Sequence, residues 1–498
     1  MPVPFVTRST FRKTLTIAAS VLAAALVTGA VLLHLYWPFT EAAVRRELGN
    51  AASAEVSFGR FHEKYFPPGC VADGVVIKKS GASVPLITVG RLVIRSNIFG
   101  LLHHHVSLLR AEGAKVNWQH VDTDSESHSK PTIIDKLVAD DATLEVPRSS
   151  PDGPLRFVFH KFEVGNLRGQ GHSSFAAEFD NPLPHGLLRV SGHFGPWNDS
   201  QPTKTALDGN YSLEHADLGV FHSIAGFVSS TGRFSGMFDH IEVQGQTSTP
   251  ELQVTSTHHG LPLQTDFSAL VVGPSGDVFL RTVKAQFGRD ELDAHGSIAR
   301  GGDRRRVGNI DIQCDNGRIG DTFYPFIHSP KPALIGKVKF RMHVMIPPEK
   351  EKFVKKITVQ STFQIDDAKF THPETQMRLS KVAETPNQQD PDTAIPAQFQ
   401  GQVSLKDGIA RFSELKVQDQ GAAAAFRGNF DLTDQRVNMR GQLKTEASLT
   451  KATHGIKSVF AKVVEPFFKK KPHETVVPVK ISGTYSHPQF GLDLNEKM

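Results

Sequence analysis

Histidine is the residue type that most invites a chemical role in this 498-residue sequence. His103, His104 and His105 are consecutive, and His120 and His128 follow them. Imidazole nitrogens bind zinc, but neighbouring residues of a strand point to opposite faces, so three adjacent histidines do not converge on one ion. We therefore expect no metal site in this segment.

Carboxylates gather at two further places. The segment RDELDAHG, residues 289–296, contains Asp290, Glu291, Asp293 and His295, and Asp140-Asp141 is an adjacent pair. We expect both groups to lie in solvated turns, because adjacent carboxylates do not flank a substrate as glycoside hydrolysis requires. The sequence contains no nucleophile elbow, phosphate-binding loop, zinc-protease motif or dinucleotide-binding motif in a suitable context. We expect no catalytic residue and no cofactor, and hence no enzyme.

The composition points to apolar surface rather than to nucleic acid. Phe occurs 34 times, against five Tyr and three Trp, so most aromatic side chains have no polar group. The net charge of +5 is spread along the chain, and no basic block alternates with aromatic residues. Cys70 and Cys314 are too few for a metal set or a disulfide framework. We expect them to be unpaired, with one disulfide between them as the alternative.

Alternating strands dominate the sequence from Val56 onward. In residues 408–443, apolar residues alternate with polar ones, Asp407-Gly408 predicts one hairpin turn, and TDQR, residues 433–436, predicts another. Each such strand has one apolar and one polar face, and the apolar face must be covered. The cover is either the sheet itself, closed into a barrel or sandwich, or a ligand in an open trough. The candidates for a lipid-lined trough are Phe412, Leu415, Val417, Phe426, Phe430, Leu432, Val437, Met439 and Leu443.

A glycine recurs between two large residues in many of these strands. Examples are VSGHF at 190, LDGNY at 207, FQGQV at 399, FRGNF at 426, MRGQL at 439 and ISGTY at 481. Such a glycine allows the sheet to bend or another group to approach its face closely. The alternative is that each glycine marks a β-bulge.

Two helices are predicted beside the strands. Residues 39–52 form a short helix with Thr40 as its cap and Gly49 or Asn50 at its end. Residues 453–471 form a basic amphipathic helix, which suits either a membrane surface or the end of the apolar sheet. Its candidate membrane-surface residues are Ile456, Phe460, Phe467, Phe468, Lys469, Lys470 and Lys471.

The N-terminus carries the strongest local signal. Residues 15–37 contain no formal charge and, as a helix, would reach roughly 35 Å, enough to cross a hydrocarbon core of about 30 Å. Basic residues precede this run, and Tyr36, Trp37 and Phe39 at its far edge resemble an aromatic interface belt. This pattern predicts a single membrane span with a cytoplasmic N-terminus. A signal peptide cleaved after Thr28-Gly29-Ala30 is the alternative.

These signals divide the chain into six segments. They are a cytoplasmic tail (1–13), a transmembrane helix (14–37), an N-terminal region (38–120), a β-rich middle region (121–380), a linker rich in Pro, Gln and Asp (381–398) and a C-terminal region (399–498). The expected fold is mainly β: a transmembrane helix, then an elongated, twisted antiparallel sheet folded into a groove, with an amphipathic helix near the C-terminus.

Two regions of the chain resemble the AsmA family of bacterial envelope proteins. One is the N-terminal span followed by VSFGRFHEKYFPPGCVADGVVIKK and RLVIRSNIFGLLHHHVSLLRAEGAKVNWQ. The other is the C-terminal region, which ends with Gly483 and Pro488 in a Gly-x-x-x-x-Pro pattern. The resemblance covers somewhat under half of the chain and carries no catalytic motif.

The resemblance implies a protein anchored in the inner membrane, with the bulk of its chain in the periplasm. It implies a trough that holds or conducts phospholipid and supports outer-membrane lipid homeostasis and assembly. The alternative is an assembly factor that binds outer-membrane or other envelope proteins through its sheet edges, without lipid. A hydrolase that uses Asp290 or Asp293 is a third hypothesis. Neither the resemblance nor the residues indicate nucleic-acid binding.

Overall fold

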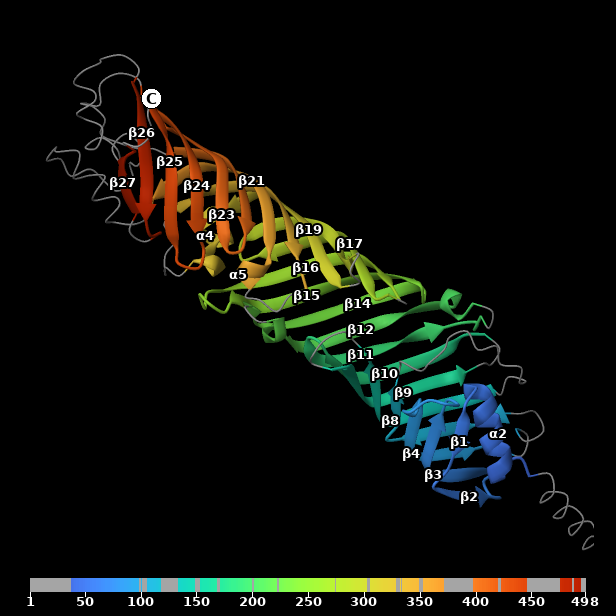
Figure 1. Cartoon of the computed structure of the whole chain (residues 1–498). Helices are drawn as coiled ribbons and strands as arrows, with labels where there is room; N and C mark the ends of the chain where they lie inside the picture. Colours follow the sequence, from blue (N-terminus) through green and yellow to red (C-terminus); the bar gives the residue numbers. More distant parts are fainter. Residues whose placement is uncertain are drawn as a thin grey trace, which may run out of the picture. The chain divides into compact units, whose positions relative to one another are not determined.

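The computed structural model describes residues 37–97, 100, 105–117, 133–147, 153–167, 171–198, 201–221, 224–273, 275–301, 305–327, 332, 334–348, 353–370, 397–419, 422–445, 475–485 and 488–493. The chain is mainly β, and its strands form one large mixed sheet (Figure 1). It divides into two compact units, residues 1–175 and 176–498.

Helix α2 (Glu41–Ala52) opens the first unit. The Thr40 side chain accepts a hydrogen bond from the Ala43 N–H at 3.3 Å, which confirms the predicted N-cap. The end at Gly49 or Asn50 was wrong. The helix continues to Ala52, and Ser53 ends it in the left-handed conformation while donating its N–H to the Asn50 carbonyl.

The strands of the first unit form antiparallel pairs, except for three short strands that pair in parallel with β8. Strand β3 pairs with β1, β2 and β4, and β4 pairs with β6 and β7, all antiparallel. Strands β5, β6 and β7 each pair in parallel with the long β8, which then pairs antiparallel with β9. The bounds are β1 (Glu55–Ser57), β2 (Arg60–Lys64), β3 (Gly69–Lys78), β4 (Ile87–Arg95), β5 (His105–Val106), β6 (Leu108–Glu112), β7 (Lys115–Asn117), β8 (Ile133–Val146) and β9 (Leu155–Leu167).

The core of the first unit lies between α2 and these strands. Trp37 and Phe39 are buried in it, with 4% and 8% of their surfaces exposed, beside Val44 of α2 and Val75 of β3. They therefore do not form the exposed interface belt that the sequence predicted. The reason is that both residues directly precede α2 and pack with it onto the sheet.

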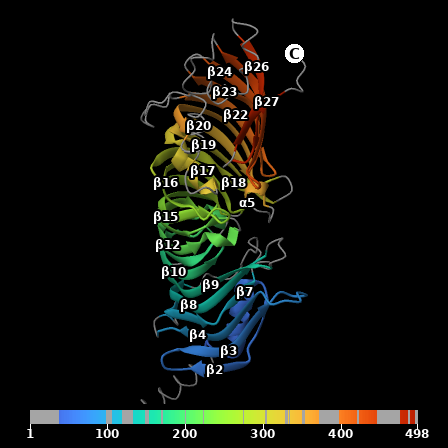
Figure 2. The same ribbon diagram turned by 90° about the vertical axis from the view of Figure 1, so that its left-hand side faces the viewer.

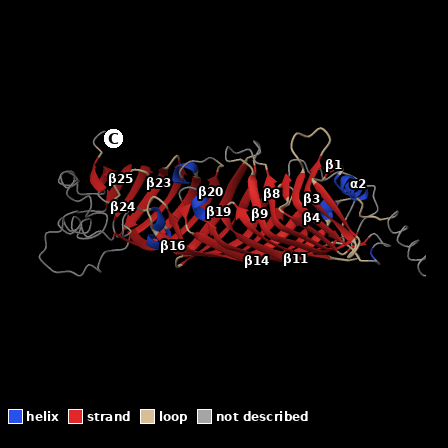
Figure 3. Cartoon of the chain, turned by 90° about the horizontal axis from the view of Figure 1, so that it is seen from below, coloured by secondary structure: helices blue, strands red, loops and turns tan. Residues whose placement is uncertain are grey.

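The second unit is an antiparallel succession of strands in chain order (Figures 2 and 3). From β11 onward, each strand pairs antiparallel with the next along the chain, except at the short β13. Strand β12 pairs with β14, and β13 pairs with β15. Strand β10 (Ser173–Pro182) contains the unit boundary. The others are β11 (His185–Phe194), β12 (Ala206–Asp217), β13 (Ile224–Ala225), β14 (Phe227–Met237), β15 (His240–Val254), β16 (Gly260–Val272), β17 (Asp277–Phe287), β18 (Asp290–Arg300), β19 (Arg306–Arg318), β20 (Leu334–Ile346), β21 (Thr358–Phe370), β22 (Ala397–Lys406), β23 (Ile409–Asp419), β24 (Ala422–Asp431), β25 (Arg436–Thr445), β26 (Thr475–Gly483) and β27 (Pro488–Leu492).

Turn chemistry sets this order. Asp407 and Gly408 both have positive φ, 55° and 77°, and connect β22 to β23 as the sequence predicted. The second predicted hairpin, β24 to β25, also forms. The described helices of this unit are short: η2 (Pro202–Lys204), η3 (Leu218–Phe221), α4 (Ile319–Thr322), η4 (Tyr324–Phe326) and α5 (Phe353–Lys356).

Three predicted segments fall wholly or largely outside the described residues: the membrane span, the linker and the helix at 453–471. Strand β22 begins at Ala397, two residues inside the expected linker. Among the helices that the structure describes, none is long and apolar enough to cross a membrane.

Candidate functional site

The histidines and carboxylates singled out in the sequence are only partly within the described residues. His105 lies beside Asp135, with Nε2 2.5 Å from Oδ1. His103, His104, His120 and His128 lie outside the described residues. In the part of the chain that the structure describes, no group of three or more His, Cys, Asp or Glu is placed to hold a metal ion.

Neither carboxylate group lies in a turn, which corrects the expectation from the sequence: Asp140 and Asp141 lie within β8, and Asp290 lies in β18. It begins β18 and has only 1% of its surface exposed. Its carboxylate accepts hydrogen bonds from the Thr322 hydroxyl at 2.6 Å and from the Arg318 N–H at 3.0 Å. Asp293, three residues along β18, is exposed, but it lies in the strand and not in the expected turn. Asp290 therefore fixes α4 against the sheet, and its oxygens are occupied by protein donors.

Uncharged residues, most of them apolar, occupy corresponding positions on successive strands of the second unit. Tyr211 of β12 pairs with Gly232 of β14, and this register continues strand by strand to Phe490 of β27. Paired residues of neighbouring strands project on the same face, so these positions form one line across the sheet. We call this line the apolar row: Tyr211, Gly232, Gly245, Phe267, Val283, Ala294, Ile312, Met342, Ser361, Val403, Phe412, Gly428, Met439, Ile481 and Phe490.

Aromatic rings cover the recurring glycines on this face. A β-carbon at Gly232 would lie 2.7 Å from Cε1 of Tyr211, and one at Gly245 would lie 3.2 Å from Cε1 of Phe267. Three glycines of the motif found in the sequence lie under a ring in the same way: Gly209 under Phe234, Gly401 under Phe363 and Gly441 under Phe426. Gly192 and Gly428 instead lie against the backbone of the neighbouring strand. These glycines keep regular register, so they mark close approach rather than bulges.

The apolar row is only half-covered through most of its length. Tyr211, Phe267, Val283 and Ile312 are all of intermediate exposure. In the described part of the second unit, strands mainly contact their hydrogen-bonded neighbours, and the chief helix against the sheet is α4, beside β19 and β20. The described elements therefore supply no second layer across this face.

The face becomes more buried toward the C-terminus. Leu443, Val477 and Val479 have at most 1% of their surfaces exposed, and Phe426 has 5%. These side chains form one cluster with half-buried neighbours such as Phe412 and Phe490. The register places the lipid-groove candidates Phe412, Leu415, Val417, Phe426, Phe430, Val437, Met439 and Leu443 on this single face. Leu432 departs from the set, because it lies in the turn after β24.

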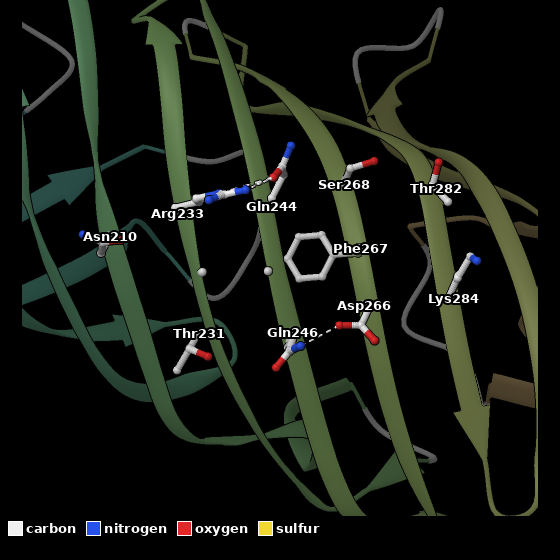
Figure 4. Close-up of a pocket in the computed structure, with 12 residues that line it drawn as sticks. Asn210, Thr231, Arg233, Gln244, Gln246, Asp266, Phe267, Ser268, Thr282 and Lys284 are labelled. Atoms are coloured by element: carbon white, nitrogen blue, oxygen red, sulfur yellow. Dashed lines mark hydrogen bonds between the residues drawn. The ribbon is translucent and has the colours of Figure 1, made fainter.

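The opposite face of the same strands is polar. Figure 4 shows Arg233 bonded to Gln244 and Gln246 bonded to Asp266, with nitrogen–oxygen distances of 2.8 and 2.7 Å. An open hollow of about 700 Å³ lies on this face. Polar side chains line it on both sides of the positions of Gly232, Gly245 and Phe267. A similar hollow of about 750 Å³ lies over β18 to β23, lined mainly by polar side chains such as Asp311 and Gln402. Both hollows belong to a solvated surface.

The membrane-surface candidates Ile456, Phe460, Phe467, Phe468, Lys469, Lys470 and Lys471 lie outside the described residues. The cysteines are described, and both Cys70 and Cys314 are buried free thiols. The sequence predicted a groove through residues 121–380, but the groove residues that it named all lie between Phe412 and Leu443, so most of the apolar row was missed. The alternation in β12 to β20 was the signal that would have found it.

Comparison of the chain with protein-family models, with curated proteins and with solved structures finds no match.

Proposed function

We propose that the apolar row and its flanking apolar side chains hold or conduct phospholipid acyl chains. The observation that carries the proposal is the row itself. It runs through fifteen residues, from Tyr211 to Phe490, and none of them is charged. Through β12 to β19 the described protein leaves its side chains half-exposed. An acyl chain bound along the row would bury the side chains that the sheet leaves half-exposed.

The energetics suit a carrier rather than a tight receptor. Burial of apolar surface is favourable by about 25 cal/mol per Å² and has no directional requirement. Neighbouring strands are about 4.8 Å apart, so a lipid that slides by one strand exchanges one set of apolar contacts for a similar set. Movement along such a face needs no catalytic group.

The protein would carry out this function in a bacterial envelope. The uncharged run at 15–37 supports an anchor in the inner membrane, with the remainder of the chain in the periplasm. This arrangement and the strand patterns support assignment to proteins like those of the AsmA family. The protein would then support lipid homeostasis and assembly of the outer membrane.

Photo-crosslinking on neighbouring residues of β17 tests the proposal. Val283 is on the apolar row, whereas Thr282 is its neighbour on the polar face. We expect benzoylphenylalanine at position 283, introduced into the full chain in cells, to form phospholipid adducts that mass spectrometry detects. The same group at position 282 serves as the matched control and should form few.

Equal adduct yields at the two positions would contradict a lipid-selective face. Protein adducts at both positions without lipid would favour the alternative function, an assembly factor that binds other envelope proteins.

A further inference from the structure

The turn between β2 and β3 exposes an unusual aromatic side chain. Phe66 has 89% of its surface exposed, and the next most exposed large apolar residue in the described chain is Phe227, at 57%. Tyr65, beside it, is 46% exposed, and Pro67 is also exposed. Three consecutive residues with apolar bodies therefore project from one turn into solvent.

The base of this turn is fixed to the sheet. Pro68 is buried, and its carbonyl accepts a hydrogen bond from the Ser96 N–H at 2.7 Å. Gly69 has no room for a side chain, because a β-carbon there would collide with the Ile94 carbonyl oxygen. The turn therefore cannot fold back to hide Phe66 without breaking the edge of β3.

The turn also lies next to the point where the uncharged N-terminal run enters the folded unit. Trp37 is the last residue of that run, and its ring centroid is 4.9 Å from the ring centroid of Tyr65. Trp37 is itself buried, so it holds the turn in place rather than presenting an aromatic surface of its own. The residue that presents such a surface is Phe66.

We propose that the turn of residues 65–67 is a membrane contact, with Phe66 inserted into the bilayer that the N-terminal run spans. The chemistry of the turn fits the boundary between headgroups and acyl chains. Phe66 is wholly apolar, the Tyr65 hydroxyl suits the headgroup level, and the exposed Lys64 side chain can extend toward lipid phosphate. The carboxylate of Glu63, in β2, accepts a hydrogen bond from the Tyr65 hydroxyl at 3.3 Å.

This contact would fix the orientation of the first unit. Strand β3 starts at the turn and runs for ten residues, so its other end lies about 30 Å away. Val84, in the turn between β3 and β4, is 45% exposed at that far end. The inference rests on the proposed membrane span, and it does not depend on whether the apolar row binds lipid.

Spin labels at the two ends of β3 test the inference. Phe66→Cys and Val84→Cys are each labelled with a nitroxide in the full chain and reconstituted into phosphatidylethanolamine–phosphatidylglycerol vesicles. The unchanged chain is the labelling blank, because Cys70 and Cys314 are buried and burial raises the pKa of the Cys70 thiol to about 12. Flotation of the vesicles is measured first. Collision of each label with oxygen and with a water-soluble nickel chelate is measured next.

We expect the ratio of oxygen to nickel collisions to be several-fold higher at position 66 than at position 84. Equal ratios, with both labels open to the nickel chelate, would overturn the membrane contact while leaving the span in place. A label at 66 that is shielded from both reagents would indicate contact with protein, and would overturn it also. A chain that does not float with the vesicles would overturn the span and the contact together, whereas the crosslinking at Val283 would stand or fall separately.

Discussion

The carboxylate of Asp290 accepts hydrogen bonds from two groups of the segment that ends β19 and forms α4. Thr322 and Arg318 are its donors, and the Arg318 guanidinium lies 3.8 Å from the same carboxylate. A buried carboxylate with its oxygens engaged in this way stabilises local packing. The arrangement gives the hydrolase hypothesis no support at Asp290, since the carboxylate is buried and both of its oxygens accept hydrogen bonds from protein donors.

Asp290→Ala should lower the free energy of unfolding by about 2–4 kcal/mol, because the Thr322 hydroxyl and the Arg318 N–H lose a charged partner in a buried place. Urea denaturation followed by circular dichroism measures the change. Asp293→Ala, on the exposed face of the same strand, is the control and should change it by less than about 0.5 kcal/mol. Equal losses for the two variants would contradict the structural role.

In several strands, an aromatic side chain lies over a glycine of the neighbouring strand. Tyr211 extends over both Gly232 and Gly245, so one ring spans two neighbouring strands. The bare backbone under the ring lets it lie close to the sheet, which buries apolar area without a second layer. This device explains how a long antiparallel succession is stabilised among its own neighbours.

Gly232→Ala should destabilise the second unit by about 1–3 kcal/mol. The new β-carbon would collide with the Gln244 carbonyl oxygen and would lie 2.7 Å from Cε1 of Tyr211, so both the backbone and the ring must move. Gly308→Ala is the matched control on β19. Its β-carbon would meet nothing nearer than Cβ of Ile346 at 3.4 Å, so the change should be neutral or slightly stabilising. Thermal unfolding of both variants measures the difference, and a neutral Gly232→Ala would show that the ring is not held against the glycine.

At the scale of the whole molecule, the proposed function assigns two tasks to two parts of the chain. The run at 15–37 anchors the protein in the membrane, and the apolar row with its flanking side chains binds lipid. Phe430 of β24 is half-buried on the apolar face, and Asn429 is its exposed neighbour on the polar face. A charge on the apolar face would have to be desolvated by any bound acyl chain, which is costly. The two neighbours therefore allow the same charge to be placed on either face.

Phe430→Asp should reduce the phospholipid that copurifies with the full chain, whereas Asn429→Asp should not. Lipid extraction and mass spectrometry measure the load, and flotation shows that both variants remain in the membrane. An unchanged load in Phe430→Asp would count against lipid binding near β24.

The sequence by itself determined the fold class and the local geometry. Alternation predicted antiparallel strands, Asp407-Gly408 predicted its hairpin, and Thr40 predicted its cap, because each depends on interactions within a few residues. It also grouped most groove candidates correctly on one face, since the period of a strand is two residues.

Only the tertiary structure decided what depends on distant residues. The burial of Asp290 requires α4, the burial of Trp37 requires α2 and the first sheet, and the exposure of Phe66 follows from a turn fixed by Ser96. The apolar row likewise exists only through register between strands, because a shift of one residue would turn each strand's apolar side chains to the other face. Local pattern states which residues are apolar, and the pairing of strands decides where they meet.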